Sequence, residues 1–147
     1  MRRVVIRGLV RNRSPRELTE LLSRFERYPT CTSTVISVDS EQLGDGYKRS
    51  AWEIQFEDGV LKWVEDEWIE PDHGRIAFKL VSGDLKRLEG WWRATAAGSD
   101  SEVTFDVTFE SGLGPSDVVD PIAERVLRED FEVIMQAVIG DQLELVA

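Results

Sequence analysis

Two glutamates near the middle of the chain have the spacing that acid/base chemistry requires. Glu65 and Glu67 lie in the stretch LKWVEDEWI, residues 61–69. Residues two apart in a strand point to the same face, so these carboxyl groups would lie about 7 Å apart. In a partly apolar pocket they would raise each other's pKa, and the pair could supply a general acid and a general base. Dehydration or ring closure of a hydroxylated substrate needs that chemistry.

The orientation of this strand decides whether the two glutamates can act on a bound molecule. If the face that carries Trp63 is turned inward, Glu65 and Glu67 are turned inward with it. In the opposite orientation Val64 belongs to the inner face, and the glutamates lie in solvent beside basic residues of neighbouring strands. Charged residues are rarely buried without partners. The sequence leaves both orientations open, and Glu65 and Glu67 are the candidate catalytic residues.

Other reactive side chains are few. His73 is the only histidine and lies in the turn PDHG, where a histidine is more typical of an exposed spacer than of a catalyst. Cys31 is the only cysteine, so it cannot form an intrachain disulfide, and we expect a small buried residue. The sequence contains no Cys/His metal cluster and no nucleotide-binding glycine motif, so we expect no metal and no cofactor.

Composition and charge exclude several classes of protein. The chain has 147 residues and a formal net charge of -10, which disfavours nucleic acid as a partner. No apolar run approaches the roughly 18 residues that cross a bilayer, so no membrane span is predicted. The start MRRVVIRGLVRNRS lacks the continuous apolar region of a signal peptide. We therefore expect a cytoplasmic protein with a single domain over residues 1–147.

A strand and a short helix begin the pattern of elements that must position these residues. Residues 3–10, RVVIRGLV, are β-branched and aliphatic, which is typical of a strand. Ser14 and Glu17 have the spacing of a capping box, with Pro15 at the first helical position. The apolar residues that follow recur at helical spacing, which predicts a short amphipathic helix over residues 15–25.

Six strands separated by turn signals come next, and a long helix follows them. The turns are rich in Gly and Asp, and consecutive strands with such short connections predict an antiparallel meander. Asp120 can cap a helix that has Pro121 at its first position and Gly140 at its end, which predicts a helix over residues 121–139. Its broad apolar stripe indicates that one side packs against the sheet. The predicted strands are residues 32–41, 47–56, 60–69, 75–81, 85–96 and 101–111.

The last of these strands fixes the inner face of the sheet. Phe105 and its apolar neighbours alternate with polar residues, so Phe105 faces the core. Pairing across the turn AGSD then places Leu88 and Trp92 on the inner face and Trp91 on the outer face. We expect Gly90 to leave space beside Trp92. Trp91 should be covered by Arg or Lys side chains, or by a partner subunit.

Two local stretches resemble those of a known superfamily. FERYP, residues 25–29, is similar to a turn common in polyketide cyclase/dehydrase and coenzyme-Q-binding START-like proteins. GDLKRLEGWWRA, residues 83–94, is similar to the Leu-x-Gly and tryptophan segment of the same group. The order of strands and helices resembles the START-like helix-grip superfamily over nearly the whole chain. This resemblance implies an α+β fold in which a seven-stranded antiparallel sheet wraps around the long C-terminal helix.

The resemblance also implies a cavity between sheet and helix that holds a hydrophobic, often polycyclic or isoprenoid, ligand. Similarity to aromatase/cyclases turns the face with Trp63 inward and places Glu65 and Glu67 in the cavity. The chain departs from those enzymes where Glu67 replaces an arginine and Val35 replaces a tyrosine, so their arginine chemistry is not implied here. The predicted ligand-binding residues are Tyr28, Trp63, Phe78, Leu88, Trp92, Phe105 and Ile134.

These observations favour a polyketide cyclase/dehydratase-like enzyme of antibiotic biosynthesis, with cofactor-free acid/base catalysis on a hydrophobic natural-product intermediate. A non-catalytic carrier of lipid, quinone or polyketide is the alternative, because such a cavity needs only apolar walls and a few polar groups. A third hypothesis is an interaction module that presents Trp68 and Trp91 to a partner or to a second copy. The expected partner is a hydrophobic small molecule, and an acyl carrier protein and a homodimer are considered as further partners.

Overall fold

One antiparallel sheet of eight strands forms the frame of the protein. The computed structural model describes residues 1–146. The strands lie in the order β2-β3-β4-β5-β6-β7-β1-β8, so β2 to β7 form the predicted meander and β1 pairs with β7. Their bounds are β1 Arg2–Val10, β2 Val35–Gly44, β3 Tyr47–Phe56, β4 Gly59–Glu70, β5 Arg75–Gly83, β6 Arg87–Ala97, β7 Asp100–Glu110 and β8 Leu143–Leu145.

The prediction of seven strands is wrong by one, because β8 was not predicted. After the C-terminal helix the chain turns at Gly140 and runs back beside β1, where Leu143 pairs with Val10 and Leu145 pairs with Gly8. A strand of three residues is too short to show the alternation of apolar and polar residues that identifies a strand in a sequence.

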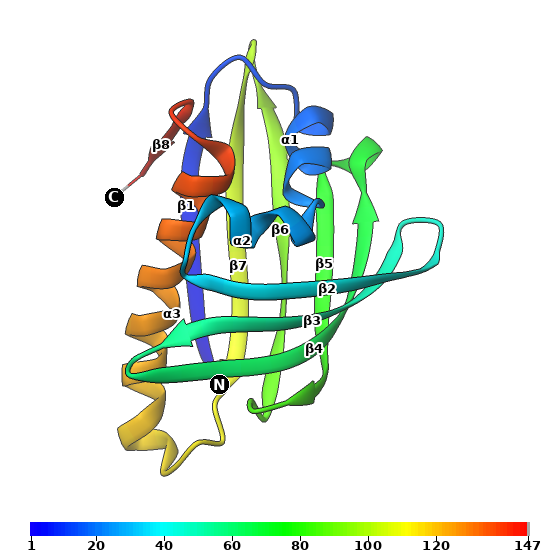
Figure 1. Cartoon of the computed structure of the whole chain (residues 1–147). Helices are drawn as coiled ribbons and strands as arrows, with labels where there is room; N and C mark the ends of the chain where they lie inside the picture. Colours follow the sequence, from blue (N-terminus) through cyan, green and yellow to red (C-terminus); the bar gives the residue numbers. More distant parts are fainter. Residues whose placement is uncertain (147) are drawn as a thin grey trace.

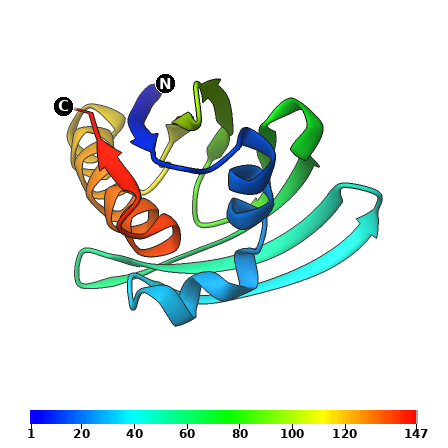
Figure 2. The same cartoon turned by 90° about the horizontal axis from the view of Figure 1, so that it is seen from above.

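Three helices lie on the concave side of this curved sheet. The longest, α3, runs along β1, and the sheet curves around it (Figure 1). The view from above shows α1 and α2 on the same concave side as α3 (Figure 2). This is the helix-grip architecture. The helices are α1 Pro15–Leu22, α2 Tyr28–Cys31 and α3 Ser116–Ile139, with short 3-10 turns at Phe25–Arg27 and Pro71–His73.

The first helix begins as predicted and ends earlier. The Ser14 side chain accepts a hydrogen bond from the Glu17 backbone and the Glu17 side chain accepts one from the Ser14 backbone, which confirms the capping box. The helix ends at Leu22 rather than at residue 25, and the Tyr28 hydroxyl donates to the Leu22 carbonyl at 2.6 Å. The chain turns inward after Leu22, so the rings of Phe25 and Tyr28 are buried in the core.

The long helix begins before its predicted start. It starts at Ser116, so Pro121 lies inside it and removes one backbone hydrogen bond of an early turn. Asp120 does not cap the helix, because its carboxylate is buried and accepts hydrogen bonds from the backbone and the hydroxyl of Ser111. These bonds fix the connection from β7 to α3. Within residues 1–146, no helix combines the length and the apolar character needed to cross a membrane.

The adjacent tryptophans of β6 point to opposite faces of the sheet, as predicted. Trp92 is 5% exposed and faces the core. Trp91 faces outward, with the guanidinium carbon of Arg93 4.9 Å from its ring centre. The expectation for Gly90 was wrong, because a Cβ atom there would lie 2.1 Å from the carbonyl oxygen of Asp106. Gly90 permits a close approach of two strands and opens no space beside Trp92.

Candidate functional site

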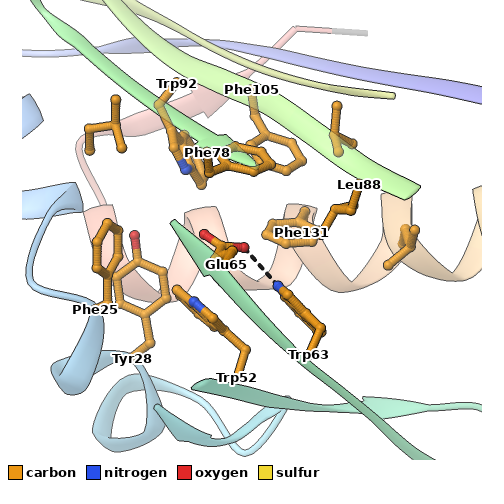
Figure 3. Close-up of a pocket in the computed structure, with 13 residues that line it drawn as sticks. Phe25, Tyr28, Trp52, Trp63, Glu65, Phe78, Leu88, Trp92, Phe105 and Phe131 are labelled. Carbon is orange, nitrogen blue, oxygen red and sulfur yellow. Dashed lines mark hydrogen bonds between the residues drawn. The ribbon is translucent and has the colours of Figure 1, made fainter. Parts of the chain in front are cut away.

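A small cavity lies between the concave face of the sheet and α3. Its volume is about 20 Å³, which is room for about one water molecule. Figure 3 shows two groups of aromatic side chains with Glu65 between them. One group is Phe25, Tyr28, Trp52 and Trp63, the other is Phe78, Trp92, Phe105 and Phe131, and Ile76, Leu88, Val107 and Leu127 complete the lining with Glu65.

Ring-to-ring contacts hold both aromatic groups in place. Trp52 and Trp63 pair across β3 and β4, and their rings are nearly parallel at 5.9 Å between centroids. In the other group Phe131 of α3 stacks on Phe105 of β7 at 4.3 Å. Such pairs contribute about 0.5–1.5 kcal/mol each beyond the burial of their surface. The walls of the cavity are therefore packed side chains, and little empty space separates them.

Glu65 is the acidic side chain that reaches the cavity. The inward orientation of β4 is the one observed, and Glu65 is 5% exposed. The indole N–H of Trp63 donates to a carboxyl oxygen of Glu65 at 2.7 Å (Figure 3). Burial raises the pKa of Glu65 well above its usual range, and the charge of Glu67 and a hydrogen bond with it raise that pKa further. Glu65 therefore keeps its proton to a higher pH than an exposed glutamate does.

Glu67 lies behind Glu65 and does not line the cavity. Its side chain is fully buried. The Ser50 hydroxyl donates to one of its oxygens at 2.5 Å, and the Trp52 indole N–H donates to the other at 3.0 Å. Burial raises the pKa of Glu67, whereas the hydrogen bonds from Glu65, Ser50 and Trp52 and the charge of Lys48 lower it. On balance the pKa of Glu67 is raised as well. Glu67 accepts hydrogen bonds from Ser50 and Trp52, whereas Glu65 accepts one from Trp63. When the pair holds a single proton, these donors favour the negative charge on Glu67 and the proton on Glu65.

The buried phenol of Tyr28 is a fixed hydrogen-bond donor. Burial raises its pKa well above the usual range, and the charges of Glu67 and Glu65 raise it further. Its proton is directed to the backbone carbonyl of Leu22. Tyr28 therefore shapes the wall of the cavity through its ring and remains protonated.

The structure brings most of the predicted site residues together. Glu65, Tyr28, Trp63, Phe78, Leu88, Trp92 and Phe105 line one cavity. Ile134 is buried but does not line the cavity. The residues of α3 that line the cavity are Leu127 and Phe131. A role for any of these residues in catalysis or binding stays a prediction.

Sequence reasoning missed several lining residues that carried a usable signal. Trp52 is directly opposite Trp63 in the β3–β4 hairpin, and that pairing follows from the short turn EDG. Phe131 belongs to the apolar stripe of the long helix, and Phe25 opens the stretch FERYP. The other missed residues are Ile76, Val107 and Leu127.

The remaining reactive side chains lie away from the cavity. His73 is exposed in the turn between β4 and β5. Cys31 is exposed at the end of α2, so the expectation of a buried cysteine was wrong. Among the residues that the structure describes, no group of three or more His, Cys, Asp or Glu side chains is arranged to hold a metal ion.

Comparison with known families gives one match over most of the chain. The family described as polyketide cyclase / dehydrase and lipid transport matches residues 12–132. The match includes all of the strands from β2 to β7 and most of α3. No curated protein sequence matches the chain at a significant level.

Several solved structures have the same fold. The TTHA0849 protein from Thermus thermophilus has a TM-score of 0.86 and 19% identity, with 94% of each chain covered. The Zhui aromatase/cyclase from a Streptomyces species has a TM-score of 0.84 and 17% identity, with 96% of this chain and 93% of that chain covered. A START superfamily protein from Mycobacterium smegmatis has a TM-score of 0.78 and 18% identity, with 95% and 96% covered. At these identities the likeness establishes a shared fold.

Proposed function

Because the chain belongs to the polyketide cyclase/dehydrase and lipid transport family, we propose that it cyclises or dehydrates a hydrophobic natural-product intermediate without a cofactor. The observation that carries this proposal is the buried carboxyl group of Glu65 between two aromatic walls. An acid that keeps its proton in an apolar cavity can protonate a weakly basic hydroxyl or carbonyl oxygen of a bound substrate. Glu65 is the general acid of the proposal.

A dehydration can be written with Glu65 as the only group in contact with the substrate. Glu65 gives its proton to the leaving hydroxyl, the carbon–oxygen bond breaks, and water departs. The resulting carboxylate accepts the proton of the neighbouring carbon as the double bond forms, so Glu65 ends the cycle protonated. Glu67 remains ionised behind it, held by Ser50 and Trp52. Its negative charge favours the return of the proton to Glu65, so Glu67 is a positioning residue in this scheme.

The aromatic walls suit a flat, conjugated substrate. Stacked and edge contacts with indole and phenyl rings stabilise planar rings without fixing the identity of their substituents. Apart from Glu65 and the phenol of Tyr28, the lining side chains are aliphatic, phenyl or indole groups. A hydroxyl or carbonyl group of such a substrate therefore finds its strongest hydrogen-bond donor in Glu65.

Substrate binding in this scheme requires the cavity to expand. Pockets for small molecules measure about 300–1,000 Å³, whereas this cavity measures about 20 Å³. Leu127 and Phe131 close the cavity on the side of α3, so the proposal requires these side chains to move away from the sheet. Association should then be slower than diffusion, because only the expanded state binds.

The test is turnover of hydroxylated polyketone and polycyclic analogues by three variants. Glu65→Gln keeps the shape of the side chain and removes the acid, so turnover should fall by about 100-fold or more. Glu67→Gln should have a smaller effect. Asp66→Asn is the matched control, because Asp66 lies between the two glutamates on the opposite face of β4. Unchanged turnover in Glu65→Gln would overturn the assignment of the general acid.

A carrier of lipid, quinone or polyketide is the second candidate. The observation that favours it is the nearly uninterrupted apolar lining around one carboxyl group, since a carrier needs only apolar walls and an orienting polar group. Native mass spectrometry of the freshly purified protein separates the two. A bound, chemically unchanged lipid favours the carrier, and conversion of an added analogue favours the enzyme.

Partners and location complete the proposal. We expect the protein to act in the cytoplasm on an intermediate that is free or attached to an acyl carrier protein. Incubation of the same substrate in free and carrier-bound form distinguishes these two. Faster turnover of the carrier-bound form would identify the acyl carrier protein as a partner.

A further inference from the structure

A row of hydroxyl and carboxyl groups connects Glu65 with the edge of the sheet. The side-chain oxygens of Ser40 and Ser50 lie 2.7 Å apart, and the Ser50 hydroxyl donates to Glu67 at 2.5 Å. Glu67 and Glu65 lie two residues apart on the same buried face of β4, and Glu65 lines the cavity. Hydrogen bonds join Ser40, Ser50 and Glu67, and Glu67 lies next to Glu65 on its strand.

The register of three strands produces this row. Ser40 of β2 pairs with Ser50 of β3, and Ser50 pairs with Glu65 of β4. The strand β2 is at the edge of the sheet, and Ser40 is half-buried there. Ser50 and Glu67 are fully buried. The row therefore runs from a position with access to solvent to a position beside the cavity.

The hydrogen bonds of the row have one direction. The single proton of the Ser50 hydroxyl is used in the bond to Glu67, so Ser50 accepts in its bond with Ser40 and Ser40 donates. Donors thus point from the edge of the sheet toward the carboxylate. A buried hydroxyl is costly unless it is hydrogen-bonded. The Ser50 hydroxyl both accepts and donates a hydrogen bond within this row.

Two other polar side chains near the row have hydrogen-bond partners outside it. The Lys48 ammonium donates to the backbone carbonyl of Ser23 at 3.3 Å and lies over the ring of Phe25. The Tyr28 hydroxyl donates to Leu22. Neither side chain donates a hydrogen bond to Ser40, Ser50 or Glu67 among the contacts of residues 1–146.

We propose that Ser40, Ser50 and Glu67 form a proton path that equilibrates Glu65 with solvent while the cavity is closed or filled by a ligand. A proton from solvent binds the Ser40 oxygen as the Ser40 proton moves to Ser50. The proton of Ser50 moves to Glu67, and a proton moves from Glu67 to an ionised Glu65. One proton enters, each hydroxyl again carries one proton, and Glu67 is again ionised.

The path meets a requirement of a closed apolar site. A Glu65 that has lost its proton cannot regain it readily from the cavity side, where there is room for about one water molecule. The path reaches Glu65 from behind, through the sheet. This inference rests on the proposed function for its purpose, because the dehydration scheme starts from a protonated Glu65, and the path restores that state whenever Glu65 ionises between turnovers.

The experiment measures proton exchange at Glu65 without any substrate. Time-resolved infrared spectra after rapid dilution into heavy water follow the deuteration of a protonated, buried carboxyl group, and loss of the band in Glu65→Gln assigns it. Ser40→Ala removes the outermost hydroxyl and leaves the hydrogen bonds from Ser50 and Trp52 to Glu67, so exchange should slow by at least tenfold without a change in the pH midpoint of the band. Ser40→Thr keeps a hydroxyl at the same position and should exchange like the unmodified protein.

A second pair of variants addresses the buried link. Ser50→Ala should slow exchange and also shift the pH midpoint, because it removes a hydrogen bond of Glu67. Ser50→Thr keeps the hydroxyl and should restore fast exchange. If Ser50→Ala does not fold, as judged by circular dichroism, the Ser40 pair still decides the question, because Ser40 is half-buried on an edge strand.

The results separate this inference from the proposed function. Unslowed exchange in Ser40→Ala, with turnover lost in Glu65→Gln, overturns the path and leaves the enzyme. Slowed exchange in Ser40→Ala, with turnover unchanged in Glu65→Gln, supports the path and overturns the catalytic role. Slowed exchange in Ser40→Ala with an unchanged pH midpoint of the band, together with loss of turnover in Glu65→Gln, supports both.

Discussion

The two faces of β4 present the same kind of side chain to different surroundings. On the outer face Asp66 accepts two hydrogen bonds from Arg49, at 2.7 and 3.1 Å, which lower its pKa. On the inner face no basic side chain among residues 1–146 forms an ion pair with Glu65, and burial raises its pKa. The pKa values of two neighbouring acids on one strand are thus shifted in opposite directions from that of a free carboxyl group. Burial and partners therefore decide the acidity of these carboxyl groups, and the acid without an arginine partner is the one that we propose as the general acid.

The largest expected effect contrasts the aromatic residues of the two faces. Trp52→Ala removes a buried ring that contacts Phe25, Tyr28 and Trp63, so it should lower the free energy of unfolding by about 3–5 kcal/mol. Trp68→Ala on the outer face removes a ring that is 39% exposed and stacks only on Tyr47, and should cost about 1 kcal/mol. Urea unfolding measures both. Equal losses would break the distinction between a packed inner face and an open outer face.

The next effect concerns the pH dependence of stability. The pKa of Glu65 is raised in the folded state, so the folded protein binds the proton more tightly than the unfolded chain does. This contribution to stability is fully present below the unfolded pKa and is lost as the pH rises through the folded pKa, by about 1.4 kcal/mol for each unit of pKa difference. Glu65→Gln should therefore lose less stability between acidic and alkaline pH. Unfolding curves across this range that match the unmodified protein would contradict the buried acid.

A smaller effect of opposite sign is expected on the outer face. The pKa of Asp66 is lowered, so its contribution is present above the unfolded pKa and is lost as the pH falls through the folded pKa. Asp66→Asn should cost up to about 1 kcal/mol at neutral pH. Because this ion pair is partly exposed, added salt should weaken the effect. Salt should not change the effect of Glu65→Gln, and a shared salt dependence would show that both acids meet solvent.

The last contrast concerns the outer aromatic surface, where the quantity to measure is self-association. A hollow on the outer face lies between Trp68 and Trp91, with the small residues Ala77 and Gly90 between them. If this surface joins two copies, Trp68→Ala should weaken self-association about tenfold, which corresponds to about 1.4 kcal/mol. Sedimentation equilibrium measures the change. A protein that remains monomeric at high concentration would remove the homodimer from consideration.

Alternation of apolar and polar residues was sufficient to predict the meander and its inner face. The strands around Phe105 and Trp92 have one face that is clearly apolar, so only one register buries it. The strand around Glu65 has an inner face that mixes Trp63 with two glutamates, and the pattern fits either orientation. Trp63 of the same strand donates to Glu65, but the partners of Glu67 are Ser50 and Trp52 of β3, which the sequence of a single strand does not reveal.

The size of the cavity could not be predicted from the sequence. Lining residues such as Trp92 follow from strand register, but the volume left between them depends on how closely Phe131 of α3 stacks on Phe105. That contact joins residues far apart in the chain, and its distance is set by the packing of the whole helix. The hydrogen-bonded row from Ser40 was missed for the same reason, since it joins three strands.

The attachment of α3 at both ends limits the motions by which it can admit a ligand. Hydrogen bonds between Ser111 and Asp120 hold its beginning, and β8 pairs with β1 directly after its end. Because both ends of the helix are held, it cannot move away from the sheet about a single hinge. Asp120 and Phe131 lie about three helical turns apart and so on nearly the same side of α3. A roll that turned Phe131 out of the cavity would therefore also withdraw Asp120 from Ser111. Rotation of the Phe131 side chain about its own bonds leaves both anchors in place.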